Sequence, residues 1–190
     1  MNFLKIKNFL LVFLIIFSYL ISVVKTYAVD ITADRTISSS SDGDQYNIKT
    51  NNDIDVIVTN NSTLERNQKI FNVSAASLTG SSITIHLGSS VIAETNSIFS
   101  NGAELTITNT GTIEATNSKA INVSNSDGVS ITNNNNGVIK SNNNTILGDA
   151  GTGADNVTID NSGEIFTTAT GTESSAIVFA NNDTGNTITN

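Results

Sequence analysis

The feature of the sequence that most restricts its fold is a short pattern that recurs through the second half of the chain. Residues 105–114 read LTITNTGTIE, residues 129–139 read VSITNNNNGVI, and residues 157–166 read VTIDNSGEIF. Each copy has two apolar residues separated by one polar residue, followed by an Asn, a Gly and a further Ile. A fourth copy begins at Thr187. Repeats with a period of about 20 to 50 residues indicate units that stack on one another, so the pattern predicts a solenoid.

Three apolar points recur in each repeat, and each lies in a segment that alternates apolar and polar residues. When the second apolar residue of each opening segment is taken as its anchor, the spacings are 27, 22, 24, 28 and 29 residues, and the anchors are Val58, Ile85, Ile107, Ile131, Ile159 and Ile188. The second point is Leu64, Val91, Ile113, Ile139 and Ile165, and the third lies in segments that begin at Phe71, Ile98, Ile121, Ile146 and Ile177.

These three points predict a three-sided coil. Side chains of a strand alternate between its two faces, so stacked repeats bring the inward Ile and Val residues into one core. We expect an all-β coil of about five to six turns over residues 55–190. We expect no helix after residue 28, because Asn, Gly, Ser and Thr are poor helix formers and dominate the composition there.

One polar position is shared by most repeats, two residues after the anchor. It holds Asn in all copies but one, where Leu87 takes its place, and its members are Asn60, Asn109, Asn133, Asn161 and Asn190. We predict that these side chains point inward at a corner and hydrogen-bond to one another in a ladder, which satisfies buried amides. The Asn residues, and Gly111 and Gly163 after them, also suit a left-handed corner.

The first 28 residues have the pattern of a signal peptide. Lys5 and Lys7 precede an uncharged and mostly apolar stretch over residues 9–24, and small residues precede a cleavage point after Ala28. An uncleaved N-terminal anchor is the alternative, and both interpretations predict export. Residues 29–54 are polar and rich in turn formers, so we interpret them as an N-terminal cap or irregular first turn of the coil.

Charge restricts the partners. Cleavage after Ala28 removes three of the nine cationic residues and none of the 17 acidic ones, which leaves 6 − 17 = −11. Such a chain is not expected to bind nucleic acid or an anionic membrane, which both need a basic surface. The chain has no Cys, so disulfide bonds do not stabilise it.

The repeated Ile-Thr-Asn pattern, together with the later pairs Ala120/Ile121 and Ala176/Ile177, resembles passenger domains of bacterial autotransporters. The resemblance covers about residues 55–190 and the signal peptide. It implies a right-handed parallel β-helix on the surface of a Gram-negative bacterium, with a stalk or adhesion role. A surface ligand or host-cell partner is expected, and so is a translocator β-barrel, either in the full-length protein or from a partner.

The chain stops shortly after a new repeat begins, so we expect a fragment, a truncated gene product or a short relative, monomeric if its ends are capped.

No residues predict catalysis, cofactor binding or a metal site. We interpret His86 as an outward strand residue, Glu114 and Glu164 as equivalent surface carboxylates, and Lys119 and Lys140 as isolated cations. The loop at residues 148–156 has spaced Asp and Gly residues but lacks a calcium-repeat order, and calcium binding there stays open. We therefore expect no enzyme activity and no cofactor.

Two alternatives from other functional classes remain. Secreted β-helices include carbohydrate-active lyases and hydrolases, which require acidic and basic residues converging on one face. An ice-binding solenoid requires a regular hydroxyl array instead. The pairs Thr106/Thr108 and Thr187/Thr189 fit such an array, but the equivalent pairs are Thr84/His86, Ser130/Thr132 and Thr158/Asp160, which break it in charge and shape.

Overall fold

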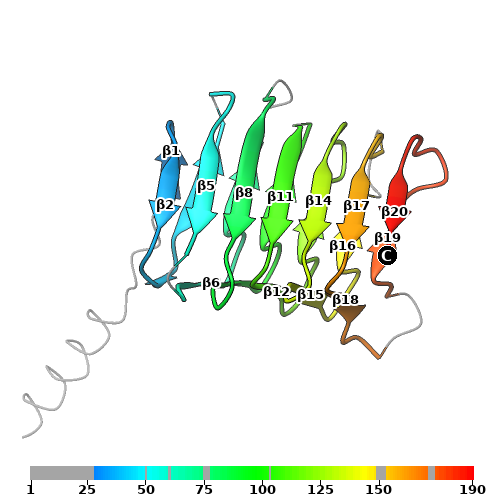
Figure 1. Ribbon diagram of the computed structural model, residues 1–190. Helices are drawn as coiled ribbons and strands as arrows, with labels where there is room; N and C mark the ends of the chain where they lie inside the picture. The colour runs from blue at the N-terminus through cyan, green and yellow to red at the C-terminus, as the bar shows by residue number, and fades with distance from the viewer. Residues whose placement is uncertain are drawn as a thin grey trace, which may run out of the picture.

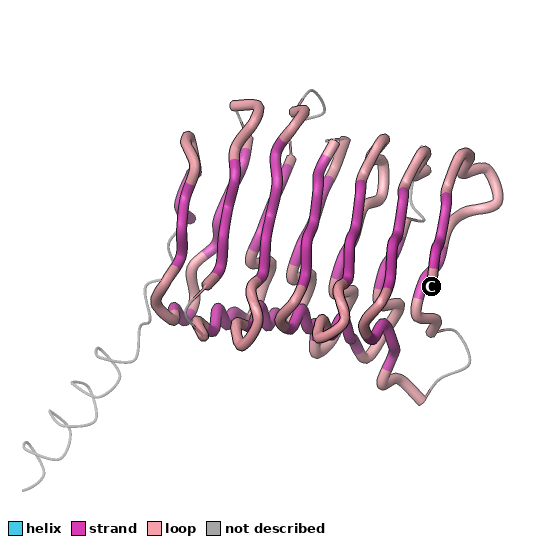
Figure 2. Tube along the Cα trace, in the orientation of Figure 1, coloured by secondary structure: helices cyan, strands magenta, loops and turns pink. Residues whose placement is uncertain are grey.

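The computed structural model describes residues 28–190 except Thr50, Asn60, Ala103 and residues 75–77, 149–152 and 171–173. The predicted signal peptide and Asn60 therefore lie outside the described residues, apart from Ala28. The described chain consists of short strands joined by turns and contains no helix (Figure 2). Accordingly, no helix within this part of the chain is long and apolar enough to span a membrane.

The strands form three parallel sheets that make a three-sided solenoid, as predicted (Figure 1). The first sheet contains β1 (Ala28–Ile31), β4 (Gln45–Ile48), β7 (Phe71–Val73), β10 (Ile98–Ser100), β13 (Ile121–Asn122), β16 (Ile146–Leu147) and β19 (Ile177–Val178). The second sheet contains β2 (Arg35–Ile37), β5 (Asp55–Val58), β8 (Ser81–Ile85), β11 (Leu105–Asn109), β14 (Ser130–Asn133), β17 (Thr158–Asn161) and β20 (Thr187–Thr189). The third sheet contains β3 (Ser41–Asp42), β6 (Thr63–Arg66), β9 (Ser90–Ala93), β12 (Thr112–Ala115), β15 (Val138–Ser141) and β18 (Glu164–Thr167).

Alternation of side chains produces the core. In β9, β12 and β15 the burial alternates residue by residue, with the apolar or small residue inward at the second and fourth positions. Each turn adds such residues from all three sheets, and the result is one continuous hydrophobic cluster from Ile31 to Ile159. Burial of apolar area in this cluster stabilises the stack, because no single turn buries its own apolar side.

The predicted registers of the first and third sheets are confirmed. Ile113 pairs with Val91 and with Ile139, and Ile121 pairs with Ile98 and with Ile146. In these two sheets, the inward apolar residues of each strand can be aligned with those of the neighbouring strands in one register only. The apolar points of these two sheets were therefore assigned to the right strands.

The predicted register of the second sheet is wrong in its first half. Ile107 pairs with Ile83 and not with Ile85, and Ile85 pairs with Asn109. Val58 pairs with Ile85, as predicted, so the anchors that match Ile107 are Val56 and Ile83. A shift of two residues keeps the same side chains inward, so alternation alone does not detect it. β8 has one more inward residue than its apolar pattern indicates, because the buried Ser81 occupies the position of Leu105.

Solenoid pairing begins earlier than the repeat predicts. Residues 29–54, interpreted as a cap or irregular first turn, contain the end of β1 and all of β2, β3 and β4. β1 pairs with β4 over four residues, and β2 pairs with β5. Tyr46 of β4 is buried and its ring stacks on Phe71, 5.6 Å away between centroids. This stretch therefore contributes to the core although its sequence is polar.

The Asn ladder is present in the later turns. Asn109 Nδ2 donates to Asn133 Oδ1 at 2.9 Å, and Asn133 Nδ2 donates to Asn161 Oδ1 at 2.8 Å. Asn161 Nδ2 then donates to Asn190 Oδ1 at 2.5 Å. Asn109 and Asn133 are fully buried. With the corrected register, the position before Asn109 belongs to Ile85 and not to Leu87, which is exposed. Val58 precedes Ile85 there, so the ladder begins at Asn109.

The reason for Asn and Gly at this corner differs from the prediction. The ladder Asn residues, Gly111 and Gly163 are not among the described residues with positive φ, which include Asp53, Asn61, Asn125 and Asn156 on other turns. Instead, a Cβ at Gly111 would overlap the carbonyl oxygens of Ser89 and His86. Gly is thus required because the backbones of successive turns approach closely there.

Candidate functional site

The candidate site is an open depression of about 410 Å³ at the corner where the third sheet meets the first. Gln45 of β4 and Asn72 of β7 line it from the first sheet. Gln68 and Lys69 come from the turn after β6, and Thr95 comes from the turn after β9. Residues from three successive turns of the solenoid therefore meet in this depression because the sheets are parallel and in register.

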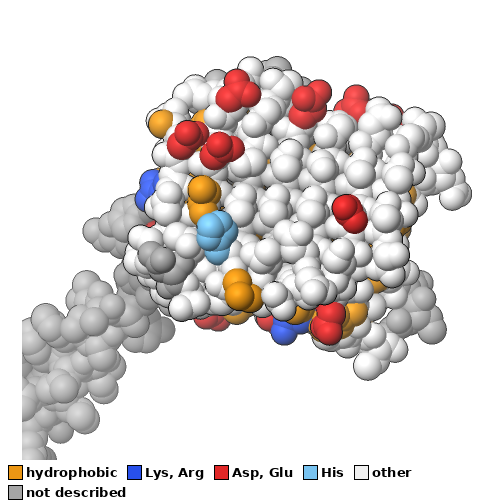
Figure 3. Space-filling view, viewed as in Figure 1, with side chains coloured by type: hydrophobic (Ala, Val, Ile, Leu, Met, Phe, Trp, Pro, Cys, Tyr) orange, Lys and Arg blue, Asp and Glu red, His pale blue; other side chains and the backbone are white. Residues whose placement is uncertain are grey.

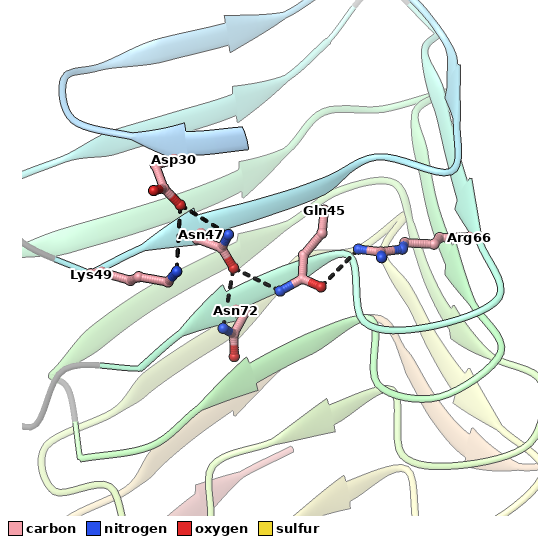
Figure 4. A network of polar contacts seen from close by, with 6 residues as sticks. All are labelled: Asp30, Gln45, Asn47, Lys49, Arg66 and Asn72. Carbon is pink, nitrogen blue, oxygen red and sulfur yellow. Dashed lines mark hydrogen bonds and ion pairs between the residues drawn. The ribbon is translucent and has the colours of Figure 1, made fainter. Parts of the chain in front are cut away.

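A polar network holds one wall of the depression (Figure 4). Arg66 Nη1 donates to Gln45 Oε1 at 2.8 Å, and Gln45 Nε2 donates to Asn47 Oδ1 at 2.7 Å. Asn72 Nδ2 also donates to Asn47 Oδ1, at 3.2 Å. Asn47 in turn donates to Asp30, whose carboxylate lies 3.5 Å from the Lys49 ammonium. Gln45 is thus held by Arg66 on one side and Asn47 on the other, whereas Asn72 is held by Asn47 alone.

Arg66 lies at the end of this network, next to Gln45 (Figure 4). Its side chain is 9% exposed, and its second contact is from Nη1 to the carbonyl oxygen of Lys69, at 3.1 Å. Burial lowers the pKa of the Arg66 guanidinium, against the opposing attraction of the Asp44 carboxylate. Arg66 Nε is buried without a hydrogen-bond partner among the described residues. The guanidinium orients Gln45 and the 66–69 turn rather than forming an ion pair.

Lys69 supplies the cationic group of the depression. Its ammonium lies 3.5 Å from the centroid of the Phe99 ring, over a half-buried aromatic face. Burial lowers the pKa of the Lys69 ammonium. The ion pairs of the described residues are Lys49–Asp30 and Lys140–Glu114, so Lys69 has no carboxylate partner among them. A cation held by a ring alone remains available to an anion.

A second surface is flat and regular, and we call it the hydroxyl face. It consists of the outward residues of β8, β11, β14, β17 and β20, which are Ser82, Thr84, Thr106, Thr108, Ser130, Thr132, Thr158, Asp160, Thr187 and Thr189. Figure 3 shows this side of the molecule, where atoms that belong to neither apolar nor charged side chains cover most of the surface, and most of the acidic side chains lie along its upper and lower margins.

The corrected register makes the hydroxyl face more regular than the sequence predicts. Ser82 and Thr84 are the pair that aligns with Thr106 and Thr108, so His86 is not part of the array. His86 lies just after β8, exposed, with Nδ1 at 3.2 Å from Thr59 Oγ1. Apart from Ser82, which donates to Asp55, the hydroxyls of the face make no hydrogen bond to described residues.

The residues considered for chemistry do not converge. The prediction that Lys140 is an isolated cation is wrong. Its ammonium lies 3.0 Å from the carboxylate of Glu114, its pairing partner in the third sheet. Glu164 pairs with Val138 and so does not share the position of Glu114. Lys119 is half-buried in the turn before β13. No cluster of three His, Cys, Asp or Glu suited to a metal occurs in the described part of the chain.

The possible calcium loop is described only in part, since residues 149–152 lie outside the described residues. The carboxylate of Asp155 accepts from Thr184 N at 2.6 Å and from Thr184 Oγ1 at 3.0 Å. The carboxylate of Asp183 accepts from Ala154 N and from Ala180 N. These carboxylates satisfy backbone donors of the turns.

Comparison with protein-family models, with curated proteins and with solved structures gives no match to this chain.

Proposed function

We propose that the chain is an exported, passenger-like solenoid that serves as a surface stalk or adhesion module of a Gram-negative bacterium. The observation that supports it is the contrast between inside and outside. The inside is one apolar core with a satisfied amide ladder, and the second-sheet face is polar and almost uncharged. A stack of in-register turns is stiff along its axis, and each turn contacts only its neighbours. Such a rod presents binding groups at a distance from its attachment.

The experiment follows the chain through a Gram-negative host. We expect the protein in the envelope or medium, accessible to added protease, with an N-terminus that begins at Val29. The matched control carries Leu11→Arg in the apolar stretch, which opposes membrane insertion of the signal and is expected to leave the protein inside. The proposal would be contradicted if the parent protein and the Leu11→Arg variant both stayed in the cytoplasm, in equal amounts and with an intact N-terminus.

A second candidate function is ice binding, and the corrected register favours it. Nine of the ten positions on the hydroxyl face carry a hydroxyl, with Asp160 as the exception. Parallel strands repeat at about 4.8 Å, so these hydroxyls form a two-dimensional lattice on a flat surface. An ordered water layer is the ligand that such a lattice would organise.

Thermal hysteresis of the purified protein tests this candidate. A hysteresis that disappears in Thr132→Lys, at the centre of the face, and persists in Thr112→Lys, on the third sheet, would support ice binding. Absence of hysteresis in the parent protein would exclude it.

A further inference from the structure

We propose that the depression lined by Gln45, Gln68, Lys69, Asn72 and Thr95 binds an acidic saccharide, with a sugar carboxylate on the Lys69 ammonium and sugar hydroxyls on the amides and on Thr95. This inference builds on the adhesion role proposed above and names the ligand class for it. Three features of the depression support it: its charge, its free hydrogen-bonding groups and its rigidity.

The charge of the depression is opposite to that of the chain. The whole chain carries −8, yet four of the six Lys and Arg residues after residue 28 lie between Arg35 and Lys69. Of these four, Lys49 is paired with Asp30 and Arg35 lies 5.4 Å from the centroid of the Tyr46 ring. Arg66 and Lys69 have no carboxylate within ion-pair distance among the described residues. Lys69 is the one charged residue among those that line the depression, so its ammonium is the charge that a bound anion would contact there.

The neutral groups in the depression have free hydrogen-bonding capacity. The side chains of Gln68 and Thr95 make no hydrogen bond to described residues, and Asn72 uses only an amide hydrogen, leaving its oxygen free. A side-chain amide both donates and accepts, and so does a sugar hydroxyl. This complementarity favours a saccharide over a simple inorganic anion, which only accepts.

The same geometry disfavours a nucleic acid. Bases of single strands bind by stacking on aromatic faces, but the face of Phe99 is covered by the Lys69 ammonium, 3.5 Å from its centroid. A polyanion with a charge on every unit is also repelled by an acidic protein. A uronic-acid saccharide, whose carboxylates alternate with neutral sugars, places one charge on Lys69 and neutral groups beside it.

The wall of the depression is held in place before any ligand binds. Arg66, nine-tenths buried, fixes Gln45 and the carbonyl of Lys69, and Asn47 fixes Gln45 and Asn72. Groups that are already ordered lose less conformational entropy on binding, which raises affinity.

The test is calorimetric titration of the purified protein with hyaluronan oligosaccharides, and with chitin oligosaccharides as neutral probes of similar size. We expect binding of the acidic probe that weakens with added salt, and binding of the neutral probe at least tenfold weaker, as expected for loss of a charge-assisted contact.

The matched variants are Lys69→Gln and Lys119→Gln. Lys119 occupies the same position two turns later, two residues before the strand residue Ile121, as Lys69 precedes Phe71, but it does not line the depression. We expect about tenfold weaker binding for Lys69→Gln and an unchanged affinity for Lys119→Gln. Thermal unfolding curves verify that both variants are folded.

Equal affinity for acidic and neutral probes, no binding of either probe, or an equal effect of the two variants would overturn the assignment. The export experiment measures the location of the protein and does not depend on saccharide binding. Failure of the saccharide site and failure of the surface role are therefore distinguishable.

Discussion

Single residues at the corner after the second sheet determine how the turns stack. Asn133 is fully buried and donates to Asn161 Oδ1, to Gly137 O and to Glu164 O, while its own oxygen accepts from Asn109. One amide therefore connects three turns. The later members of this ladder could be predicted from the sequence because an Asn follows each anchor Ile by two residues there.

Replacement of Asn133 by Ala is expected to lower the free energy of unfolding by about 2 kcal/mol, because the buried Asn109 on the preceding turn and the partly buried groups on the following turn lose their hydrogen bonds. Urea titration measures this. Asn135→Ala, at an exposed turn position two residues away, is the control and is expected to change stability by less than about 0.5 kcal/mol. Equal losses of stability in the two variants would show that the hydrogen bonds of the ladder do not stabilise the stack.

Gly111 is expected to tolerate no side chain. A methyl group there overlaps two carbonyl oxygens of the preceding turn, and such overpacking destabilises proteins by about 1–3 kcal/mol. Gly111→Ala is therefore predicted to shift the urea midpoint downward at an unchanged slope, whereas Asn136→Ala, on an exposed turn, leaves it in place. An unchanged urea midpoint for Gly111→Ala would mean that the carbonyl oxygens of Ser89 and His86 lie further from Gly111.

At the scale of the strand, alternation predicts which side chains face inward but not the register. The first and third sheets were matched correctly, because each of their strands offers one apolar set. In the second sheet, β8 has three inward positions, Ser81, Ile83 and Ile85, and nothing in its composition says which aligns with Ile107. The buried Ser81 accepts from Ile54 N at 3.3 Å, a contact no sequence pattern contains.

The candidate depression was missed for a related reason. Its wall includes Gln45 on β4, within residues interpreted as a cap. Its cation, Lys69, lies in a turn, where a lone Lys has no distinguishing pattern. Only the pairing of β4 with β7, which aligns Tyr46 with Phe71, brings these residues together. A weak signal was present in the alternation around Tyr46 and Ile48.

Equivalent core positions along one sheet are expected to contribute unequally. Ile113 is fully buried in β12, whereas Ile165, two strands further along the third sheet, is only partly buried. Ile113→Ala is predicted to cost about 2–5 kcal/mol, and Ile165→Ala clearly less, because less apolar area is lost at Ile165. Equal losses in urea titrations would contradict the burial gradient.

Across the described part of the molecule, burial declines toward the C-terminal turns. Ile188 of the edge strand β20 is 50% exposed, and no residue of β18, β19 or β20 is fully buried. In a solenoid each turn is stabilised by its neighbours, so an edge turn with one neighbour is the least stable. An unpaired strand edge is also the surface most prone to associate with another strand.

Hydrogen exchange is expected to reveal this gradient. Backbone amides of β11, β12 and β14 should exchange slowest, and those of β19 and β20 fastest among the strands, because local opening requires the loss of fewer buried contacts there. Peptide-resolved mass spectrometry after deuterium labelling measures the order. Uniform protection along the described strands would indicate all-or-none opening instead.

The second sheet of the solenoid is parallel, with Thr84 of β8 beside Thr108 of β11. Paired cysteines probe this arrangement, because the sequence contains no other Cys. Neighbouring parallel residues lie about 4.8 Å apart, within the Cα range of a disulfide, whereas a two-residue offset exceeds about 7 Å. Under mild oxidation, the double variant Thr84→Cys/Thr108→Cys is predicted to form an intramolecular disulfide, and His86→Cys/Thr108→Cys is not. An efficient disulfide in the second variant and none in the first would mean that β8 and β11 pair in a different register.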